Sequence, residues 1–236
     1  MSVSHFRFKQ FTIHHDRATM KVGTDGVLLG AWAIVHTDQY LLDIGTGSGL
    51  IALMLAQRTI NTGFIDAVEI EKYGAEQAIE NVHRSPWAQR IKVHQMAIQD
   101  FNPERKYDLI ISNPPYFQNS FKPPDEKRVQ TRHTVFLPFA DLIASVNRLL
   151  ATDGKFNVIL PNQEGLAFID LAKSNHLHCT RQWSFRTRNE KPIERWLLEF
   201  SFQEQSREEG EIILYKTGEE WSDGYKALTK EFYLKL

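Results

Sequence analysis

The sequence has little of what marks a secreted, membrane-bound or generally nucleic-acid-coating protein. Its single cysteine, Cys179, can form no internal disulfide and supplies no CxxC pair for a metal. No apolar run approaches the roughly 20 residues of a membrane-spanning helix, and the opening residues lack the apolar stretch of a signal peptide. The formal net charge of -1 argues against a uniformly basic surface, so any nucleic-acid contact has to come from a local patch. We therefore expect a cytoplasmic protein that holds no metal.

Short apolar strands alternate with helical runs along most of the chain, which is typical of an α/β domain. The 236 residues are enough for such a domain with a real core, and no internal repeat, linker or shift in composition divides them. Strands are expected at 39–44, 64–70, 91–94, 107–112, 155–160 and 211–215, helices at about 25–36, 72–83, 139–150 and 163–174, and a hairpin at 177–187 and 195–203.

The clearest unit is a strand, a glycine turn and a helical run. After the strand QYLLDI come Gly45, Thr46, Gly47, Ser48 and Gly49, and then LIALMLAQR. Such a unit opens a nucleotide-binding βαβ fold, because the glycines let a ligand approach the backbone and the helix N-terminus favours an anionic group. Leu50 stands where dinucleotide-binding proteins have the third glycine of G-x-G-x-x-G. Asp43 would repel a pyrophosphate but tolerate an amino group or a sulfonium.

Two acids follow the next two strands. Glu69 ends the second strand, where doubly wound folds place a carboxylate on the ribose hydroxyls of a nucleoside. Asp100 follows the third strand after a short connection, and a helix cap or a loop acid would explain it equally well. The two positions together favour a nucleoside ligand.

The fourth strand, YDLIIS at 107–112, runs directly into Asn113, Pro114, Pro115 and Tyr116. Proline has no N–H to continue a ladder and pushes the preceding residue into an extended conformation, so the motif lies at a strand end. There the Asn113 amide and the carbonyls beside the prolines are fixed acceptors next to the aromatic face of Tyr116. This arrangement suits a planar ligand with an NH2 group, although an ordinary strand-ending turn has the same residues.

Basic residues gather in two segments. Residues 117–134 are polar and are expected to form a loop, and residues 173–195 hold six bases and two acids with Trp183 and Phe185 between them. Bases interleaved with aromatic residues suit contacts with phosphates and unpaired bases of RNA, but any single one is more often a solvated side chain. The six bases of the second segment are Lys173, Arg181, Arg186, Arg188, Lys191 and Arg195. The candidate RNA contacts are Lys122, Arg128, Arg132, Arg186 and Arg188.

In this order, the G-x-G-x-G loop, the two acids and the NPPY motif resemble the class I S-adenosylmethionine-dependent methyltransferases that methylate amino groups. The length, the GTDGVLLGAW segment and NPPYF make the chain most similar to the bacterial tRNA1(Val) (adenine(37)-N6)-methyltransferases. The resemblance implies a mostly parallel seven-stranded sheet with an antiparallel strand near the C-terminal end. It also implies one Rossmann-like methyltransferase domain over 1–236, with an arm and a helix at 1–36, a core at 37–203 and an extension at 204–236.

The resemblance also implies a role for each motif. Asp43 and the Gly45–Gly49 loop, with Thr46, would hold the amino acid part of S-adenosylmethionine, Glu69 its ribose and Asp100 its adenine. Asn113 would border both the methyl donor and the target, accepting a hydrogen bond from the target amine together with the Pro114 carbonyl. Tyr116 would stack on the target base. The expected partner is tRNA, and we expect the enzyme to act as a monomer.

Several other functions remain open from the sequence alone. The same motif could present guanine N2 of ribosomal RNA or a glutamine side-chain amide of a protein, since each is a planar NH2 group. The missing third glycine disfavours a nucleotide-dependent oxidoreductase. A non-catalytic RNA-binding protein with a relic donor pocket is disfavoured by the intact Asp43, Glu69 and Asn113.

Overall fold

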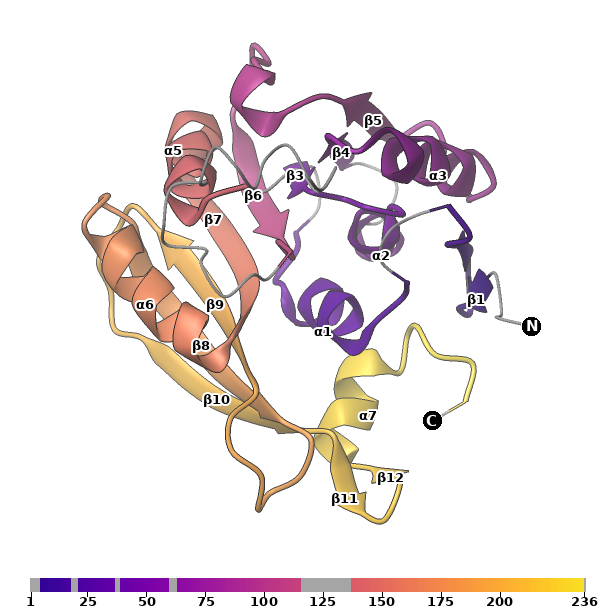
Figure 1. The fold of residues 1–236 in the computed structure, drawn as a ribbon, viewed down its shortest axis with the longest axis vertical. Helices are drawn as coiled ribbons and strands as arrows, with labels where there is room; N and C mark the ends of the chain where they lie inside the picture. Colours follow the sequence, from indigo (N-terminus) through magenta and orange to yellow (C-terminus); the bar gives the residue numbers. More distant parts are fainter. Residues whose placement is uncertain (1–4, 18–20, 37–38, 60–62, 116–136, 236) are drawn as a thin grey trace, which may run out of the picture.

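The computed structural model describes residues 5–17, 21–36, 39–59, 63–115 and 137–235. In this part of the chain an eight-stranded sheet lies between two layers of helices (Figure 1). Its strand order is β10-β8-β9-β7-β6-β3-β4-β5. The strands are β3 (Tyr40–Ile44), β4 (Phe64–Glu69), β5 (Ile91–Gln95), β6 (Tyr107–Ser112), β7 (Leu150–Pro161), β8 (His178–Arg186), β9 (Arg195–Ser201) and β10 (Glu208–Ile213).

Strand direction confirms the α/β class and the mostly parallel sheet. Only β9 runs against its neighbours, β7 and β8, and all other pairs of this sheet are parallel. The predicted number of seven strands is wrong, because β10 adds an eighth strand beside β8. β10 begins with Glu208, Glu209, Gly210 and Glu211, so its apolar part starts only at Ile212. The strand expected at 211–215 overlaps only the last three residues of β10, because an edge strand needs few apolar residues and this one begins with a polar segment.

Helices cover both faces of the sheet. On one side, α1 (Thr24–Trp32) and α2 (Leu50–Arg58) pack with residues of β3, β4 and β6. On the other side, α5 (Phe139–Leu149) and α6 (Asn162–Lys173) pack over β6, β7 and β9 (Figure 1). None of the helices in the described ranges is both long and apolar enough to span a membrane. The other helical segments are α3 (Lys72–His83), the 3₁₀ turn η1 (Ile98–Asp100) and α7 (Asp223–Thr229).

Two small antiparallel pairs lie outside the large sheet. The strand at the N-terminal arm, β1 (His5–Arg7), pairs with β2 (Thr12–His14). Near the C-terminus, β11 (Tyr215–Thr217) pairs with β12 (Glu220–Trp221). Phe8 and Phe11 of the arm lie in the same buried cluster as Tyr225 and Phe232, so the two ends of the described chain pack together.

The centre of the sheet places the motifs side by side. Ile44, the last residue of β3, is paired with Ser112, the last residue of β6. The Ser112 hydroxyl donates to the Ile44 carbonyl at 2.9 Å, which fixes the two strand ends to each other. Parallel strands end at the same edge of a sheet, so the glycine turn after β3 and Asn113 after β6 emerge together.

Some predicted boundaries differ from the structure. The first helix starts at Thr24 and ends at Trp32, earlier than the predicted 36, and its N-cap is Gly23 without a side-chain cap. β7 starts at Leu150, earlier than the predicted 155, since the chain pairs with β6 as soon as α5 ends. A Cβ atom at Gly154 would lie 2.8 Å from the Tyr107 carbonyl oxygen. Glycine therefore allows this close approach of β7 to β6.

Candidate active site

The glycine turn after β3 has a backbone that explains its G-x-G-x-G pattern. Gly45, Gly47 and Gly49 have φ angles of 72°, 56° and 84°, in the left-handed region that L side chains rarely adopt. A Cβ atom at Gly45 or Gly47 would meet no atom within 4 Å, so the turn offers bare backbone to a ligand. Gly49 is the N-cap of α2 and faces Ala78 of α3 instead. The spacing therefore fits a turn that has one glycine at each left-handed position.

Asp43 lies beneath this turn and is almost completely buried, with 1% of its surface exposed. Its Oδ2 atom accepts hydrogen bonds from Thr46 Oγ1 at 2.6 Å and from the Ala52 N–H at 3.2 Å. Burial raises the pKa of Asp43 to about 7, although these two hydrogen bonds act in the opposite direction. The Oδ1 atom is buried and has no hydrogen-bond partner among the described residues. Since an unpaired buried acceptor costs free energy, the site fits a ligand that brings an N–H donor.

Glu69 connects the end of β4 to the glycine turn. Its Oε2 atom accepts a hydrogen bond from the Gly47 N–H at 2.8 Å, and its Oε1 atom accepts one from the Glu71 N–H at 2.9 Å. Burial raises the pKa of Glu69, while the backbone hydrogen bonds counteract part of this rise. The carboxylate is therefore held at the point where a ribose would lie in a nucleoside-binding fold, with lone pairs left to accept further hydrogen bonds.

Asn113 lies at the end of β6, beside the start of α1. A Cβ atom at Gly26 would be 3.9 Å from Asn113 Nδ2 and 3.0 Å from Leu50 Cδ2. Because Gly26 has no side chain, there is space between α1, α2 and the end of β6. Asn113 is half-buried and Pro114 is buried. Tyr116, which follows the two prolines, lies outside the described residues, and so do Lys122, Arg128 and Arg132.

A cavity of about 350 Å³ brings Asn113 and the glycine turn together. Its walls come from the turn, from the start of α1 and from the hairpin of β8 and β9. Neither Glu69 nor Asp100 lines this cavity, although Glu69 is bound to Gly47, which does. Asp100 is exposed at the end of η1 and lines a different cavity, on the face of β4 and β5.

The sequence does not indicate that two charged residues of the cavity wall, Asp25 and Arg195, belong to the site. Arg195, at the start of β9, donates from Nε to Asp25 Oδ2 of α1 at 2.9 Å. Both residues line the cavity that contains Asn113. Beside them, Glu194 accepts hydrogen bonds from the Thr187 N–H and hydroxyl at 3.0 and 2.6 Å. The GTDG segment contains Asp25 and the basic segment contains Arg195, but nothing in the sequence indicates that they meet.

The hairpin arginines have different environments. Arg181 is 8% exposed and paired with Glu199 and Glu208, with its guanidinium over the Trp32 ring, so its inclusion in a basic segment suited to phosphates, or else solvated, is wrong. Arg186 pairs with Glu211 at 2.9 Å and donates to carbonyls of the β8–β9 connection. The guanidinium of Arg188 lies 5.3 Å from the centre of the Tyr215 ring.

Comparisons with known proteins agree with this architecture. The family model described as "Methyltransferase small domain" matches residues 25–174. A relative from Bacteroides fragilis, named tRNA1(Val) (adenine(37)-N6)-methyltransferase, is 45% identical over 242 residues and covers 100% of both chains. A relative of the same name from Pseudoalteromonas translucida is 43% identical, over 99% of this chain and 100% of its own.

Solved structures show the same fold at low sequence identity. A predicted O-methyltransferase from Agrobacterium tumefaciens is 17% identical and superposes with a TM-score of 0.69, covering 88% of this chain and 96% of its own. The glycopeptide N-methyltransferase MtfA in complex with S-adenosylmethionine is 12% identical and has a TM-score of 0.56, covering 78% and 100%.

Proposed function

The chain belongs to the family of the bacterial tRNA1(Val) (adenine(37)-N6)-methyltransferases, and on this basis we propose that it methylates the N6 amino group of adenine-37 in a valine tRNA. The methyl donor is S-adenosylmethionine. Full-length identity of 42–45% to relatives of this name supports the tRNA and the base. One structural observation carries the chemistry: Asn113 and the bare backbone of the Gly45–Ser48 turn line one cavity.

The donor site would be built from the ends of β3 and β4. The open backbone of Gly45 and Gly47 would receive the amino acid part of the donor, and the unpaired Asp43 Oδ1 fits its ammonium group. Glu69 would accept hydrogen bonds from ribose hydroxyls while it holds Gly47. The chemistry supplied by bound S-adenosylmethionine is an electrophilic methyl group on a positively charged sulfur. Asp100, which lies on another face, is the weakest part of the proposed donor site.

The acceptor site would be built from Asn113 and the Pro114 carbonyl. The exocyclic amine of adenine is a poor nucleophile, because its lone pair is delocalised into the ring. Two acceptors that hold both N–H bonds favour a pyramidal nitrogen, so that its lone pair is localised on nitrogen and directed toward the methyl group, and they stabilise the positive charge that develops on nitrogen. The proton released after methyl transfer passes to water. This arrangement works by orientation and electrostatics, and needs no strong general base.

RNA binding would extend from this cavity over the basic segments. A base in an anticodon loop has to leave its stack to reach Asn113, and Tyr116 would supply the stacking surface. Arg186 and Arg188 of the hairpin, with Lys122, Arg128 and Arg132, would contact phosphates. We propose that the enzyme acts on tRNA in the cytoplasm as a monomer.

The test is to incubate the protein with isotope-labelled S-adenosylmethionine and, in separate reactions, total tRNA, ribosomal RNA and a mixture of cell proteins. Nucleosides and peptides are then analysed by mass spectrometry. The proposal predicts label in N6-methyladenosine from tRNA, at position 37 of one valine tRNA. Label in N2-methylguanosine or in a glutamine side chain would contradict it and favour the other planar NH2 substrates.

A further inference from the structure

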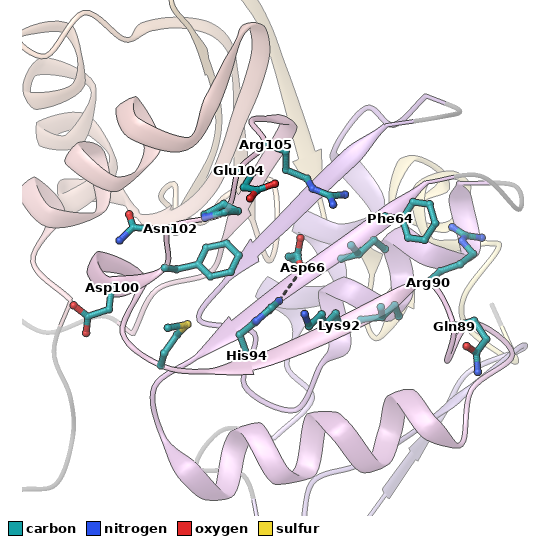
Figure 2. A pocket seen from close by; sticks show the side chains of 15 residues that line it. Phe64, Asp66, Gln89, Arg90, Lys92, His94, Asp100, Asn102, Glu104 and Arg105 are labelled. Atoms are coloured by element: carbon teal, nitrogen blue, oxygen red, sulfur yellow. Dashed lines mark hydrogen bonds and ion pairs between the residues drawn. The ribbon is translucent and has the colours of Figure 1, made fainter.

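A second cavity, of about 670 Å³, lies along the edge strand β5 and shares no residue with the Asn113 cavity (Figure 2). Its lining comes from the start of β4 (64–66), from residues between Gln89 and Met96 along β5, and from Asp100, the last residue of η1, to Arg105. The cavity thus follows the full length of the edge strand. The connection from β5 to β6 contains only η1, so no helix of this connection covers the face of β4 and β5. We call this cavity the β5 groove.

The floor of the β5 groove is a hydrogen-bonded cluster of three residues. His94 Nε2 donates to Asp66 Oδ1 at 2.6 Å, and the Tyr107 hydroxyl donates to Asp66 Oδ2 at 2.8 Å. Burial works to raise the pKa of Asp66, but the hydrogen bonds from His94 and Tyr107, together with the charges of His94 and Arg105, outweigh it, and the pKa lies below its ordinary value. Both carboxylate oxygens are engaged, while His94 Nδ1 makes no hydrogen bond among the described residues. The cluster therefore fixes the imidazole and leaves one polar ring edge for a ligand.

Beside the cluster, the apolar wall of the β5 groove is largely closed. Phe101 is 4% exposed, and its ring packs 4.9 Å from the His94 ring and 6.3 Å from the Tyr107 ring. Met96 is half-buried and lines the same end of the groove, where its flexible thioether can adapt to a ligand. The groove thus offers the fixed polar edge of His94 beside a methionine, and a base can be read there by its hydrogen-bonding edge.

The other end of the β5 groove carries positive charge. Figure 2 shows Arg90, Lys92 and Arg105 toward the end near Phe64, while Asp100 lies at the opposite end. In the described chain none of these three bases is paired with a carboxylate. Arg105 lies over the Tyr40 ring, and Arg90 is held by the Gly63 carbonyl and the Thr59 hydroxyl.

One guanidinium nitrogen of Arg90, Nη1, is buried and has no hydrogen-bond partner in the described residues. Glu104 also lines the groove, and it makes no ion pair in the described chain. Three bases without carboxylate partners suit the oxygens of phosphate groups, for which arginine and lysine are the usual ligands.

We propose that the β5 groove binds a nucleotide of the substrate RNA outside the target pocket. A phosphate would lie among Arg90, Lys92 and Arg105, and a base would lie beside Met96 with its edge toward His94. The groove adjoins the proposed donor site, because the N–H of Met96, which lines the groove, donates to the Glu69 carbonyl at 3.0 Å, so the same RNA would extend across both. This inference rests on the proposed function, since the RNA is the proposed substrate.

Other occupants fit the β5 groove less well. An apolar helix of a partner protein would bury the exposed Lys92 ammonium without a counter-charge. A metal ion would need several carboxylate or imidazole ligands, and the described residues contain no group of three or more such side chains that could hold one.

The first test uses the double variant Lys92→Gln/Arg105→Gln, in which both changed residues are exposed, with Lys235→Gln as a matched control outside the groove. Fluorescence anisotropy over a range of salt concentrations would give tRNA affinity. We expect about tenfold weaker binding, and a salt slope smaller by about 0.7 for each phosphate that the variant no longer neutralises. The control should bind as the unchanged protein does. Donor affinity by calorimetry and the rate at saturating tRNA should not change.

The second test monitors the His94 imidazole by NMR during titration with AMP and with inorganic phosphate, using His94→Gln to assign the signal. AMP should shift the signal more than phosphate does. If AMP shifts the His94 signal but the double variant binds tRNA as tightly as the unchanged protein does, the groove does not bind the RNA. If AMP shifts no signal and the double variant binds tRNA normally, the groove is not a binding site. If the protein fails to methylate tRNA, the proposed function is contradicted instead. Both tests of the groove measure binding, so their results do not depend on methylation.

Discussion

The Gly47 N–H donates to Glu69 Oε2 at 2.8 Å, so the acid at the end of β4 holds the glycine turn at the end of β3. Replacing Glu69 by alanine removes this bond and the proposed ribose contact together. We expect donor affinity to fall by about tenfold or more, while the secondary structure stays intact. Calorimetry with S-adenosylmethionine measures the first effect, and circular dichroism checks the second. Donor binding that is unaffected in Glu69→Ala would remove this residue from the site.

The buried Asp43 should make donor binding depend on pH. Its pKa is raised to about 7 in the folded protein, so it is largely protonated below that pH. The ammonium group of the donor favours the carboxylate, and affinity should therefore rise as pH increases from about 6 to about 8, with a proton released on binding. Asp43→Asn should weaken binding and abolish this proton release. Calorimetry in buffers with different ionisation enthalpies measures the number of protons directly.

The same pKa shift predicts a stability effect with a defined sign. A carboxyl group whose folded pKa lies above its unfolded value of 3.8 binds more protons when folded, so stability without donor should decrease as pH rises from about 4 to about 7. Over this pH range the Asp43 pKa shift should change the free energy of unfolding by on the order of 4 kcal/mol at most. Urea unfolding of the unchanged protein and of Asp43→Asn at about pH 5 and about pH 8 tests this. If the free energy of unfolding has the same pH dependence in both proteins, the raised pKa of Asp43 is contradicted.

The pair of Arg195 and Asp25 should act on the target side of the cavity. Arg195→Ala and Asp25→Ala each break the 2.9 Å bond that joins β9 to α1 beside Asn113. We expect each single variant to lower kcat/KM for tRNA by about tenfold. In the double variant kcat/KM should fall little further, because the effects of two residues in direct contact are not additive. Arg195→Lys should recover only part of the activity, since it cannot reproduce the planar fork. Additive effects would show that the two residues act separately.

The hairpin should contribute to RNA affinity mainly through Arg188. Arg186 already pairs with Glu211 and shapes the connection, whereas Arg188 only lies against Tyr215 in the described chain. Arg188→Ala should weaken tRNA binding and lower its salt slope by about 0.7 to 0.9. Arg186→Ala should have the same direction of effect and also reduce thermal stability. A salt slope that is unchanged in both variants would exclude hairpin contacts with phosphates.

The local units of the fold could be predicted from the sequence, because each is determined by residues that are neighbours in the chain. The G-x-G-x-G spacing matches three left-handed backbone positions, and the prolines after Asn113 end β6 where expected. The order of these units along the chain then places Asp43, Glu69 and Asn113 at one edge of the sheet. The relative placement of distant elements can be predicted here from local sequence patterns, because parallel α/β folds have few possible topologies.

Features that depend on distant contacts could not be predicted in this way. Arg195 and Asp25 are 170 residues apart, and only the complete sheet brings them together. Arg181 appears in the sequence as one base among six, but Trp32 covers its guanidinium and two glutamates pair with it. The strand expected at 211–215 starts three residues earlier, at Glu208, because the polar residues before Glu211 also pair with the edge of β8. The β5 groove exists because a short connection leaves a sheet face uncovered.

Asn113 is the residue that aligns the target amine in the proposed mechanism, and one measurement tests this role most directly. A synthetic anticodon stem-loop with adenine-37 is methylated in a single turnover by the unchanged protein and by Asn113→Ala, with donor affinity measured in parallel. We predict that the rate falls by about a thousandfold in Asn113→Ala, the scale of a missing catalytic hydrogen bond, while donor affinity changes by less than about threefold. Methylation of adenine-37 at an unchanged rate by Asn113→Ala would contradict this role.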